Sequence, residues 1–264
     1  SRDVRDAIDA ASAAFPAWSG TPAERRGAVL KRAAELLLER KEEIALGLSR
    51  EGGKTRAEAD AELTRAYDHL QWNGEEAGRI EGRVIAGKAP GSQRLSIPVP
   101  LGVVAAITPW NFPAVLVARK LGAILASGCT AVLKAAEATP NTAAEVVRVL
   151  QDAGVPDGAV NLVFGEPAAV SEHLLGADEV RAVTFTGSTR VGRLIAAQAA
   201  PGLKRTVLEL GGHAPVIVDR DADLGTVVST TLPAKIGSAG QSCVAPTRYL
   251  VHEAQVDEFT RRMV

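Results

Sequence analysis

The 264-residue sequence contains only two cysteines, Cys129 and Cys243, and four histidines. Two cysteines are too few for a disulfide framework, and no C-x-x-C or H-E-x-x-H motif offers the spacing of metal ligands. We therefore expect no metal site. Because free thiols are typical of reducing compartments, we also expect a cytoplasmic protein.

The sequence also lacks a marked charge imbalance and any long hydrophobic run. Its formal net charge is −1, which favours neither a nucleic-acid partner nor an anionic membrane surface. No apolar run reaches the ~18 residues that a membrane span requires, and residues 1–15 show an amphipathic helix pattern rather than a signal peptide. A content of 46% apolar and 23% charged residues instead predicts a globular protein with a sizeable core.

Helical patterns dominate residues 1–79. Residues 21–50 show helical periodicity, with Thr21 expected as the N-cap and Glu24 as its partner in a capping box. The EGGKT segment breaks this helix, and residues 55–77 are expected to form another. Residues 80–100 differ, because two short β-like runs flank a KAPGSQ turn and predict a projecting β-hairpin.

From residue 101 onwards, apolar strand-like runs alternate with helical patterns. This alternation predicts an α/β fold with a doubly wound, mostly parallel sheet. Ligands of such sheets bind beyond the carboxyl ends of the strands. The polar residues that follow each predicted strand are therefore the candidate site residues.

Two of these candidates suit a nucleotide. Gly187 and Ser188 follow a strand and begin a helix, where backbone N–H groups can hold a phosphate, although the same residues also serve as an ordinary turn and cap. The G-x-G-x-x-G fingerprint is absent. Lys134 and Glu137 follow another strand and suit ribose hydroxyls, with the carboxylate favouring NAD over NADP. Taken alone, a surface ion pair is the simpler explanation of these two residues.

Two further candidates suit catalysis. Asn111 lies between Pro109 and Pro113 in TPWNFP, where a rigid backbone can aim its amide at an oxyanion or simply complete a local turn. Glu209 lies between leucines in LELGG. An apolar setting there favours a general base, while an outward-facing residue of a strand is the simpler explanation.

The segments PWNFP, FTGST, LELGG and GQSC, in this order, closely resemble the aldehyde dehydrogenase superfamily, and the resemblance covers the whole chain. It implies that Cys243 is the nucleophile that attacks the aldehyde carbon. It also implies that Asn111 and the backbone N–H of Cys243 hold the resulting oxyanion, and that Glu209 activates the water that hydrolyses the thioester. Cys129 carries no implied role and is expected to be a buried structural thiol.

The same resemblance implies a bound NAD cofactor, with NADP as the alternative. The implied cofactor contacts are Thr108, Pro109, Trp110, Lys134, Glu137, Gly187, Ser188, Gly192, Leu210 and Gly211. Ala135 departs from the family pattern, which usually has proline after the lysine, and this loosens the expected geometry of Lys134.

The family fold implies three regions. Residues 1–79 and 101–212 would form a Rossmann-like NAD-binding domain, residues 80–100 an oligomerisation hairpin, and residues 213–264 the beginning of a catalytic domain. The chain starts with serine and stops in a helical pattern without a stop signal, so we expect it to be cut at both ends. We expect these residues alone to be inactive or misfolded, and the complete protein to form a homodimer or homotetramer.

The substrate is less defined than the chemistry. WNFPAVLVARK resembles the semialdehyde-oxidising branch, in which an arginine at the position of Arg119 helps bind a distal carboxylate. Gly237, however, stands where that branch often has a second arginine. A small-molecule aldehyde is the expected substrate, and the small ω-carboxy aldehydes such as succinate semialdehyde are one candidate class.

Other functions predict other features. Family members that transfer the acyl group to coenzyme A or reduce acyl phosphates generally lack the base at the position of Glu209. A cysteine-dependent esterase or amidase without redox chemistry would need a histidine near Cys243. A structural or binding protein without activity would have no need for Asn111, Glu209 and Cys243 together.

Overall fold

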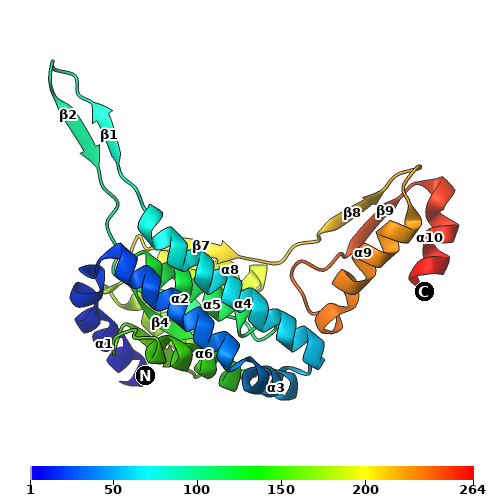
Figure 1. The fold of residues 1–264 in the computed structure, drawn as a ribbon, viewed down its shortest axis with the longest axis horizontal. Coiled ribbons are helices and arrows are strands. Elements are labelled where there is room, and N and C mark those ends of the chain that lie inside the picture. The colour runs from blue at the N-terminus through cyan, green and yellow to red at the C-terminus, as the bar shows by residue number, and fades with distance from the viewer. Residues whose placement is uncertain (1) are drawn as a thin grey trace.

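The computed structural model describes residues 2–264 as a helix-covered sheet from which two projections extend (Figure 1). The helices are α1 (Arg2–Ser19), α2 (Ala23–Glu39), α3 (Lys41–Gly52), α4 (Arg56–Glu76), α5 (Val115–Ala126), α6 (Pro140–Asp152), α7 (Pro167–Gly176), α8 (Thr189–Ala199), α9 (Leu224–Ile236) and α10 (Val256–Met263). Short 3-10 helices are η1 (Ala77–Arg79), η2 (Gly237–Gly240) and η3 (Glu253–Gln255). None of the helices described is long and apolar enough to cross a membrane.

The central sheet confirms the predicted doubly wound α/β fold. Its strands are β3 (Val103–Ile107), β4 (Thr130–Lys134), β5 (Val160–Val163), β6 (Val180–Thr186) and β7 (Arg205–Glu209). They are all parallel and lie in the order β5-β4-β3-β6-β7. The chain therefore winds outward from β3 in one direction and then returns to β6 on its other side. The carboxyl ends of the neighbouring strands β3 and β6 mark the topological switch point, beyond which ligands of such sheets bind.

Alternate residues of the inner strands β3, β4 and β6 enter two cores, one on each face of the sheet. Helices α2 to α6 cover one face and pack on strand residues such as Val104, Ala106 and Leu133. Helices α1, α7 and α8 cover the other face and pack on Val103 and Val183. Because neighbouring side chains of a strand point to opposite faces, both faces of these strands need apolar residues. This requirement explains the uninterrupted apolar runs of the sequence.

The first helices differ from the prediction in two ways. Thr21 does not cap α2, because its hydroxyl donates to the carbonyl of Ala17 at the end of α1 (3.0 Å) and Pro22 occupies the cap position. The periodic segment 21–50 also forms two helices, which separate at Arg40. The capping box of this region lies instead at the start of α4, where Thr55 caps the helix together with Glu58.

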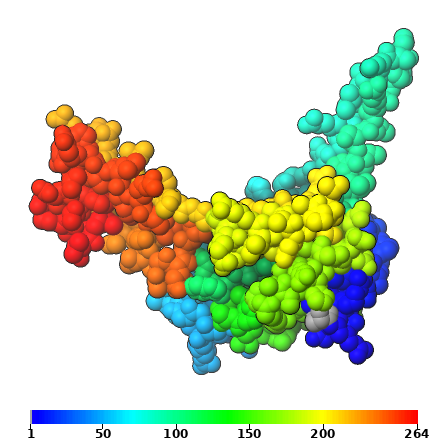
Figure 2. All heavy atoms as spheres, turned by 180° about the vertical axis from the view of Figure 1, so that it is seen from behind, coloured from blue at the N-terminus to red at the C-terminus, as the bar shows by residue number. Residues whose placement is uncertain are grey.

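Two projections leave the sheet on opposite sides (Figures 1 and 2). One is the predicted hairpin, in which β1 (Arg83–Ala86) pairs antiparallel with β2 (Gln93–Ser96), and every residue of both strands is exposed. The other is a lobe in which β8 (Pro215–Val218) pairs parallel with β9 (Arg248–Val251) beside α9 and α10. Its small core includes Val218, Leu224 and Phe259.

A close approach of α2 and α4 generates a prediction about stability. A Cβ atom at Gly27 would collide with the backbone carbonyl of Gly74, whereas one at Gly47 in α3 would meet open space. Gly27→Ala should therefore lower the free energy of unfolding by roughly 1–3 kcal/mol through overpacking. Gly47→Ala should raise it by roughly 0.5–1 kcal/mol through better helix propensity. Urea unfolding of both variants checks this, and a Gly27→Ala protein as stable as wild type would refute the packing argument.

Candidate active site

Two adjoining cavities lie at the carboxyl edge of the sheet. The larger, about 480 Å³, is lined by residues at or just beyond the carboxyl ends of β3, β4 and β6, among them Thr108, Lys134 and Ser188. The smaller, about 200 Å³, is lined by residues that follow β3, β6 and β7 and by Cys243. Both cavities share the wall formed by Pro109, Trp110, Thr186 and Gly187. The predicted site residues thus meet where the winding of the sheet reverses.

The smaller cavity contains all three predicted catalytic side chains. Asn111, Glu209 and Cys243 line it together with Arg119. Cys243 is an exposed free thiol, whereas Cys129 is buried and its sulfur accepts the backbone N–H of Leu101 (3.3 Å). Cys129 thus has the surroundings of a structural thiol, and Cys243 is the cysteine that a solute can reach.

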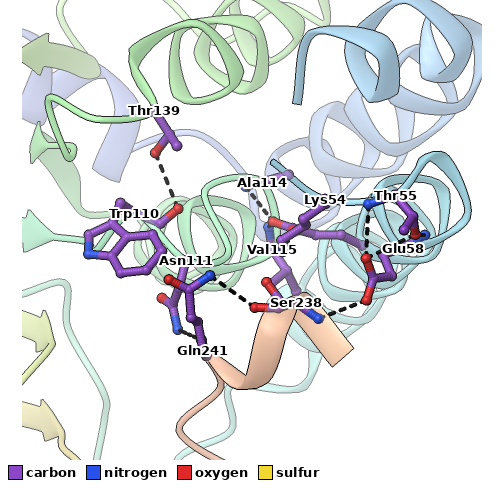
Figure 3. Close-up of polar contacts among 11 residues, drawn as sticks. Lys54, Thr55, Glu58, Trp110, Asn111, Ala114, Val115, Thr139, Ser238 and Gln241 are labelled. Carbon is purple, nitrogen blue, oxygen red and sulfur yellow. Dashed lines mark hydrogen bonds and ion pairs between the residues drawn. The ribbon is translucent and has the colours of Figure 1, made fainter. Parts of the chain in front are cut away.

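Asn111 contacts the segment that carries Cys243. Its Nδ2 donates to the carbonyl oxygen of Gln241, two residues before the cysteine (2.8 Å; Figure 3). Its Oδ1 is buried and has no hydrogen-bond partner in the part of the chain that the structure describes. An amide nitrogen has two hydrogens, so the second remains able to donate into the cavity. The bond to Gln241 orients the Asn111 amide.

Glu209 lies at the end of a strand, as predicted, but its side chain is exposed rather than surrounded by apolar residues. It is the last residue of β7 and it is exposed, so the apolar setting inferred from its leucine neighbours is wrong. The reason is that β7 is the edge strand of the sheet, and most of its residues are exposed. Glu209 reaches both the smaller cavity and a further cavity of about 370 Å³ that Arg119 and Lys120 also line.

The ion pair at the end of β4, between Lys134 and Glu137, is partly buried. Lys134 Nζ lies 2.6 Å from Glu137 Oε1, and the lysine side chain is only 7% exposed. Partial burial raises the pKa of Glu137, but the hydrogen bond from Lys134 and two backbone N–H groups outweigh it, so the pKa lies below its ordinary value. The Glu137 carboxylate, paired with Lys134, therefore faces the larger cavity.

The turn after β6 corrects one expectation. The backbone N–H of Gly187 is not free for a phosphate, because it donates to the carbonyl of Glu209 (3.0 Å) and so continues the sheet ladder. The hydroxyl of Ser188 caps α8 by accepting the N–H of Val191 (3.3 Å). Both residues still line the larger cavity. A side chain at position 187 would collide with the ring of Phe185, which explains the glycine.

Two buried hydroxyls beside this turn are free to bind a polar ligand, unlike the N–H of Gly187. Thr108 and Thr186 both line the larger cavity, and the Oγ1 atom of each is buried without a partner in residues 2–264. Buried hydroxyls are normally satisfied, so these two fit a polar ligand in the cavity. Thr186 was not a sequence candidate. The sequence could have indicated Thr186, since this residue carries a hydroxyl at the end of a predicted strand.

The remaining cofactor candidates divide into two groups. Pro109 and Trp110 line both cavities, while Leu210 and Gly211 line the smaller one. Gly192 is not among the residues that line either of these cavities. It lies buried in α8, where a Cβ atom would collide with the side chain of Leu210. Gly192 therefore serves close packing of α8 against the end of β7.

A buried ion pair that sequence reasoning missed supports the Asn111 loop. Lys54 and Glu62 form it, with side chains 2% and 0% exposed. Glu62 Oε1 accepts the N–H groups of Ala114 (2.9 Å) and Val115 (3.3 Å) at the start of α5. Lys54 Nζ lies 3.6 Å from the centre of the Phe112 ring, next to Asn111. The sequence could have indicated this pair, because Glu62 lies on the same helical face as Ala59 and Ala66, where a buried charge needs a partner.

Two basic residues of α5 flank Glu209. The Nζ of Lys120 donates to the hydroxyl of Thr184 (2.8 Å), and burial lowers the pKa of Lys120 to about 8, although the charge of Glu209 acts in the opposite direction. Arg119 Nε donates to His69 Nε2 (3.2 Å). Burial and the charge of Arg119 lower the pKa of His69. Lys120 was not a sequence candidate, although it is a charged residue within an otherwise apolar helix.

The described residues contain no group of three or more His, Cys, Asp or Glu side chains that could hold a metal ion. The geometry instead combines a reachable thiol, an amide donor, a carboxylate and a basic side chain around one cavity. A second cavity with unsatisfied hydroxyls and a charged pair lies beside it. This arrangement can bind a polar cofactor next to a covalent nucleophile.

Comparisons with known proteins agree with this geometry. The model of the aldehyde dehydrogenase family matches residues 1–264. The chain is 47% identical over 257 residues to 4-(hydroxymethyl)benzenesulfonate dehydrogenase TsaD1 of Comamonas testosteroni, which covers 97% of this chain and 54% of that protein. It is 42% identical over 261 residues to the NADP(+) succinate-semialdehyde dehydrogenase GabD of Escherichia coli K12, covering 99% of this chain and 54% of that protein.

A solved structure agrees as well. The structure of an NADP-dependent enzyme from E. coli superposes with a TM-score of 0.97 at 42% identity. The match covers 99% of this chain and 55% of that chain. The chain spans about half the length of the curated relatives it matches.

The depressed pKa of Lys120 generates a prediction about stability and pH. The folded-state pKa of about 8 lies below the ordinary value of 10.5, so the unfolded chain binds more protons between these two values. Stability from this group therefore rises as the pH rises from about 8 to 10.5, by up to about 1.4 kcal/mol for each pH unit. Wild type should gain stability relative to Lys120→Met over this range in urea unfolding.

The matched control for this prediction is Lys88→Met, which removes an exposed lysine in the hairpin turn. The difference in unfolding free energy between wild type and Lys88→Met should stay constant over the same pH range. A difference between wild type and Lys120→Met that does not change with pH would contradict the proposed cost of burying the Lys120 charge.

Proposed function

The chain belongs to the aldehyde dehydrogenase family, and from this premise we propose that the protein oxidises an aldehyde to a carboxylic acid with NAD(P)+. One observation carries the proposal. Cys243, Asn111 and Glu209 line a single cavity that shares a wall with the larger cavity at the switch point of the sheet. A thiol that attacks a carbonyl in the smaller cavity therefore lies next to the larger cavity, which can hold the nucleotide.

The first step is a covalent addition. The Cys243 thiolate attacks the aldehyde carbon, a C–S bond forms, and the electron pair of the C=O bond moves to oxygen. The second N–H of the Asn111 amide and the backbone N–H of Cys243 stabilise this oxyanion. Because the bond to Gln241 already fixes the orientation of Asn111, the donor needs little reorganisation during the reaction.

The oxidation and the release of product follow. When bound, NAD(P)+ supplies the acceptor for the hydride that leaves the aldehyde carbon. The carbonyl re-forms, and the acyl group remains on Cys243 as a thioester. Glu209 then takes a proton from water, the water oxygen attacks the thioester carbon, and the C–S bond breaks. The Cys243 thiolate is regenerated and the carboxylic acid leaves.

The larger cavity suits the nucleotide. Thr108 and Thr186 offer hydroxyls without partners, while Lys134 and Glu137 offer charges suited to ribose or phosphate. Glu137 repels a 2′-phosphate and so favours NAD+, whereas Lys134 beside it attracts one. Two of the relatives named above carry NADP in their names, and we infer that this site accepts either nucleotide.

The smaller cavity supports a preference for aldehydes that carry an anionic group remote from the reacting carbon. Arg119 lines the smaller cavity with the three catalytic candidates. The names of the two relatives, a benzenesulfonate and a succinate-semialdehyde dehydrogenase, both contain an anionic group remote from the reacting carbon. Gly237 supplies no second cation, so we place the recognition of the anion on Arg119.

The finer organisation follows the family. We assign residues 1–79 and 101–212 to the cofactor domain and residues 213–264 to the catalytic domain. The hairpin, residues 80–100, carries exposed apolar side chains such as Val84, Leu95 and Ile97, and these suit packing between subunits of a dimer or tetramer. We place the enzyme in the cytoplasm, because catalysis requires the free thiol of Cys243.

The alternatives find less support. No histidine is among the residues that line the cavity of Cys243 within the described chain, so a cysteine esterase or amidase would lack its usual base. A protein without activity would gain nothing from an amide, a carboxylate and a reachable thiol around one cavity. A cysteine esterase or amidase without redox chemistry also leaves the two unsatisfied hydroxyls in the neighbouring cavity unexplained.

The proposed chemistry predicts that NAD(P)H formation depends on Cys243. In the protein as its complete gene encodes it, an aldehyde and NAD(P)+ should give absorbance at 340 nm. Cys243→Ala should abolish this signal, because no covalent intermediate can form, while Cys129→Ala should retain it. Ester hydrolysis without NAD(P)H formation would favour the esterase alternative. Neither activity in wild type would favour a binding protein.

The proposed specificity predicts a selective effect at Arg119. Arg119→Met should lower kcat/KM for succinate semialdehyde by about 10- to 100-fold, the effect of losing one charge-assisted hydrogen bond, and should change kcat/KM for hexanal far less. Steady-state kinetics with succinate semialdehyde, hexanal and benzaldehyde measure this. Arg148→Met, on the exposed surface of α6, is the control. Equal losses for hexanal and succinate semialdehyde would reject recognition of the anion by Arg119.

A further inference from the structure

The segment before Cys243 contains a left-handed turn. Ser238, Ala239 and Gly240 have φ values of 53°, 55° and 74°, all in the left-handed region. Glycine adopts this region freely, but serine and alanine do so at a cost in free energy, and successive residues in it are rare. Such a turn persists only when contacts around it hold it in place.

A carboxylate from α4 holds the first residue of this turn. The backbone N–H of Ser238 donates to Glu58 Oε1 (2.7 Å), across 180 positions of sequence (Figure 3). The carbonyl of Ser238 accepts the backbone N–H (3.1 Å) and the Nε2 (3.0 Å) of Gln241. Gln241 in turn accepts the Asn111 amide. One chain of hydrogen bonds therefore joins α4, the turn and the oxyanion donor.

The other oxygen of Glu58 fixes the carboxylate itself. Glu58 Oε2 accepts the backbone N–H and the hydroxyl of Thr55, both at 2.9 Å, as the second half of the capping box. The N–H of Ser238, followed by these two groups, holds the pKa of the Glu58 carboxyl below its ordinary value. Capping uses Oε2, so the bond from Oε1 to Ser238 is additional to the cap.

We propose that Glu58 is a positioning residue, whose bond to the N–H of Ser238 holds the left-handed turn and so keeps Cys243 in register with Asn111. The inference deepens the proposed function and rests on it. Glu58 does not line the cavity of Cys243, and it acts through the backbone of the turn. A fixed thiol matters because a displacement of about 1 Å can cost on the order of 100-fold in rate.

Three variants separate positioning from capping. Glu58→Ala removes the bond to Ser238 and the carboxylate half of the capping box, and keeps the backbone N–H that donates to the Thr55 hydroxyl. Thr55→Ala removes the cap hydroxyl, which accepts the N–H of Glu58 and donates to Glu58 Oε2. It keeps the bond to Ser238 and the bond from the backbone N–H of residue 55 to Oε2. Glu58→Ala combined with Ser238→Gly places a residue that tolerates positive φ at the position that Glu58 binds, so the conformational cost there falls while that of Ala239 stays. Asp60→Ala, which loses only an exposed ion pair with Arg56, is the surface control.

Two readouts are used on the complete protein. The first is hydrogen exchange of the peptide that spans residues 236–246, which does not require activity. The second is steady-state NAD(P)H formation, with kcat and the KM for NAD(P)+ determined separately. The turn residues do not line the larger cavity, so a positioning defect should appear in kcat and leave this KM within about twofold.

Glu58→Ala is expected to speed exchange of this peptide and to lower kcat, each by about tenfold or more. Thr55→Ala and Asp60→Ala should change both by less than about twofold. Adding Ser238→Gly to Glu58→Ala should restore at least half of the lost kcat on a logarithmic scale.

Three results would overturn the inference: unchanged exchange in Glu58→Ala, a loss of kcat no larger than that of Thr55→Ala, or no recovery on adding Ser238→Gly. An inactive wild type would instead overturn the proposed function, so the two failures are distinguishable.

Discussion

The buried carboxylate of Glu62 is the constraint on which the site depends. It is fully buried, pairs with Lys54 and accepts two backbone N–H groups at the start of α5. Removing one partner of such a pair typically costs roughly 3–5 kcal/mol, because the other charge stays buried without compensation. The start of α5 and the ring of Phe112 are therefore fixed to α4, and Asn111 lies in the loop between them and β3.

The same helix also contacts the segment that carries the proposed nucleophile, Cys243. One turn before Glu62, Glu58 binds the backbone of the segment that carries Cys243 (Figure 3). Two segments far apart in sequence, around Asn111 and Cys243, are thereby tied to neighbouring turns of α4. The bond between Asn111 and Gln241 closes this arrangement. The sheet places the other groups, since parallel strands bring residues 108, 134, 186 and 209 to one edge.

Much of this arrangement could be predicted from the sequence. Apolar runs alternating with helical patterns are enough to indicate a parallel sheet, and polar residues at strand ends then mark the binding edge. The orientation of single charged residues could not be predicted, because a helical pattern with a glutamate at an apolar position does not show whether that glutamate is paired. Glu62 and Lys120 were missed for this reason.

The other incorrect predictions concern the hydrogen-bond partners or the surroundings of single polar groups. Thr21 was expected to cap α2, but its hydroxyl closes the last turn of α1 instead. Gly187 was expected to offer a free N–H, which the sheet ladder uses. Glu209 was expected in an apolar setting, yet β7 is an edge strand. In each case, the partner of a polar group is decided by a neighbour in space that the local sequence does not reveal.

The acyl group on Cys243 is the central claim of the account, and mass spectrometry tests it most directly. Glu209→Gln should slow hydrolysis, so that the Cys243 peptide gains the mass of the acyl thioester when aldehyde and NAD(P)+ are both present, and gains nothing when either is omitted. Continued NAD(P)H formation with Cys243 unmodified throughout turnover would contradict the account.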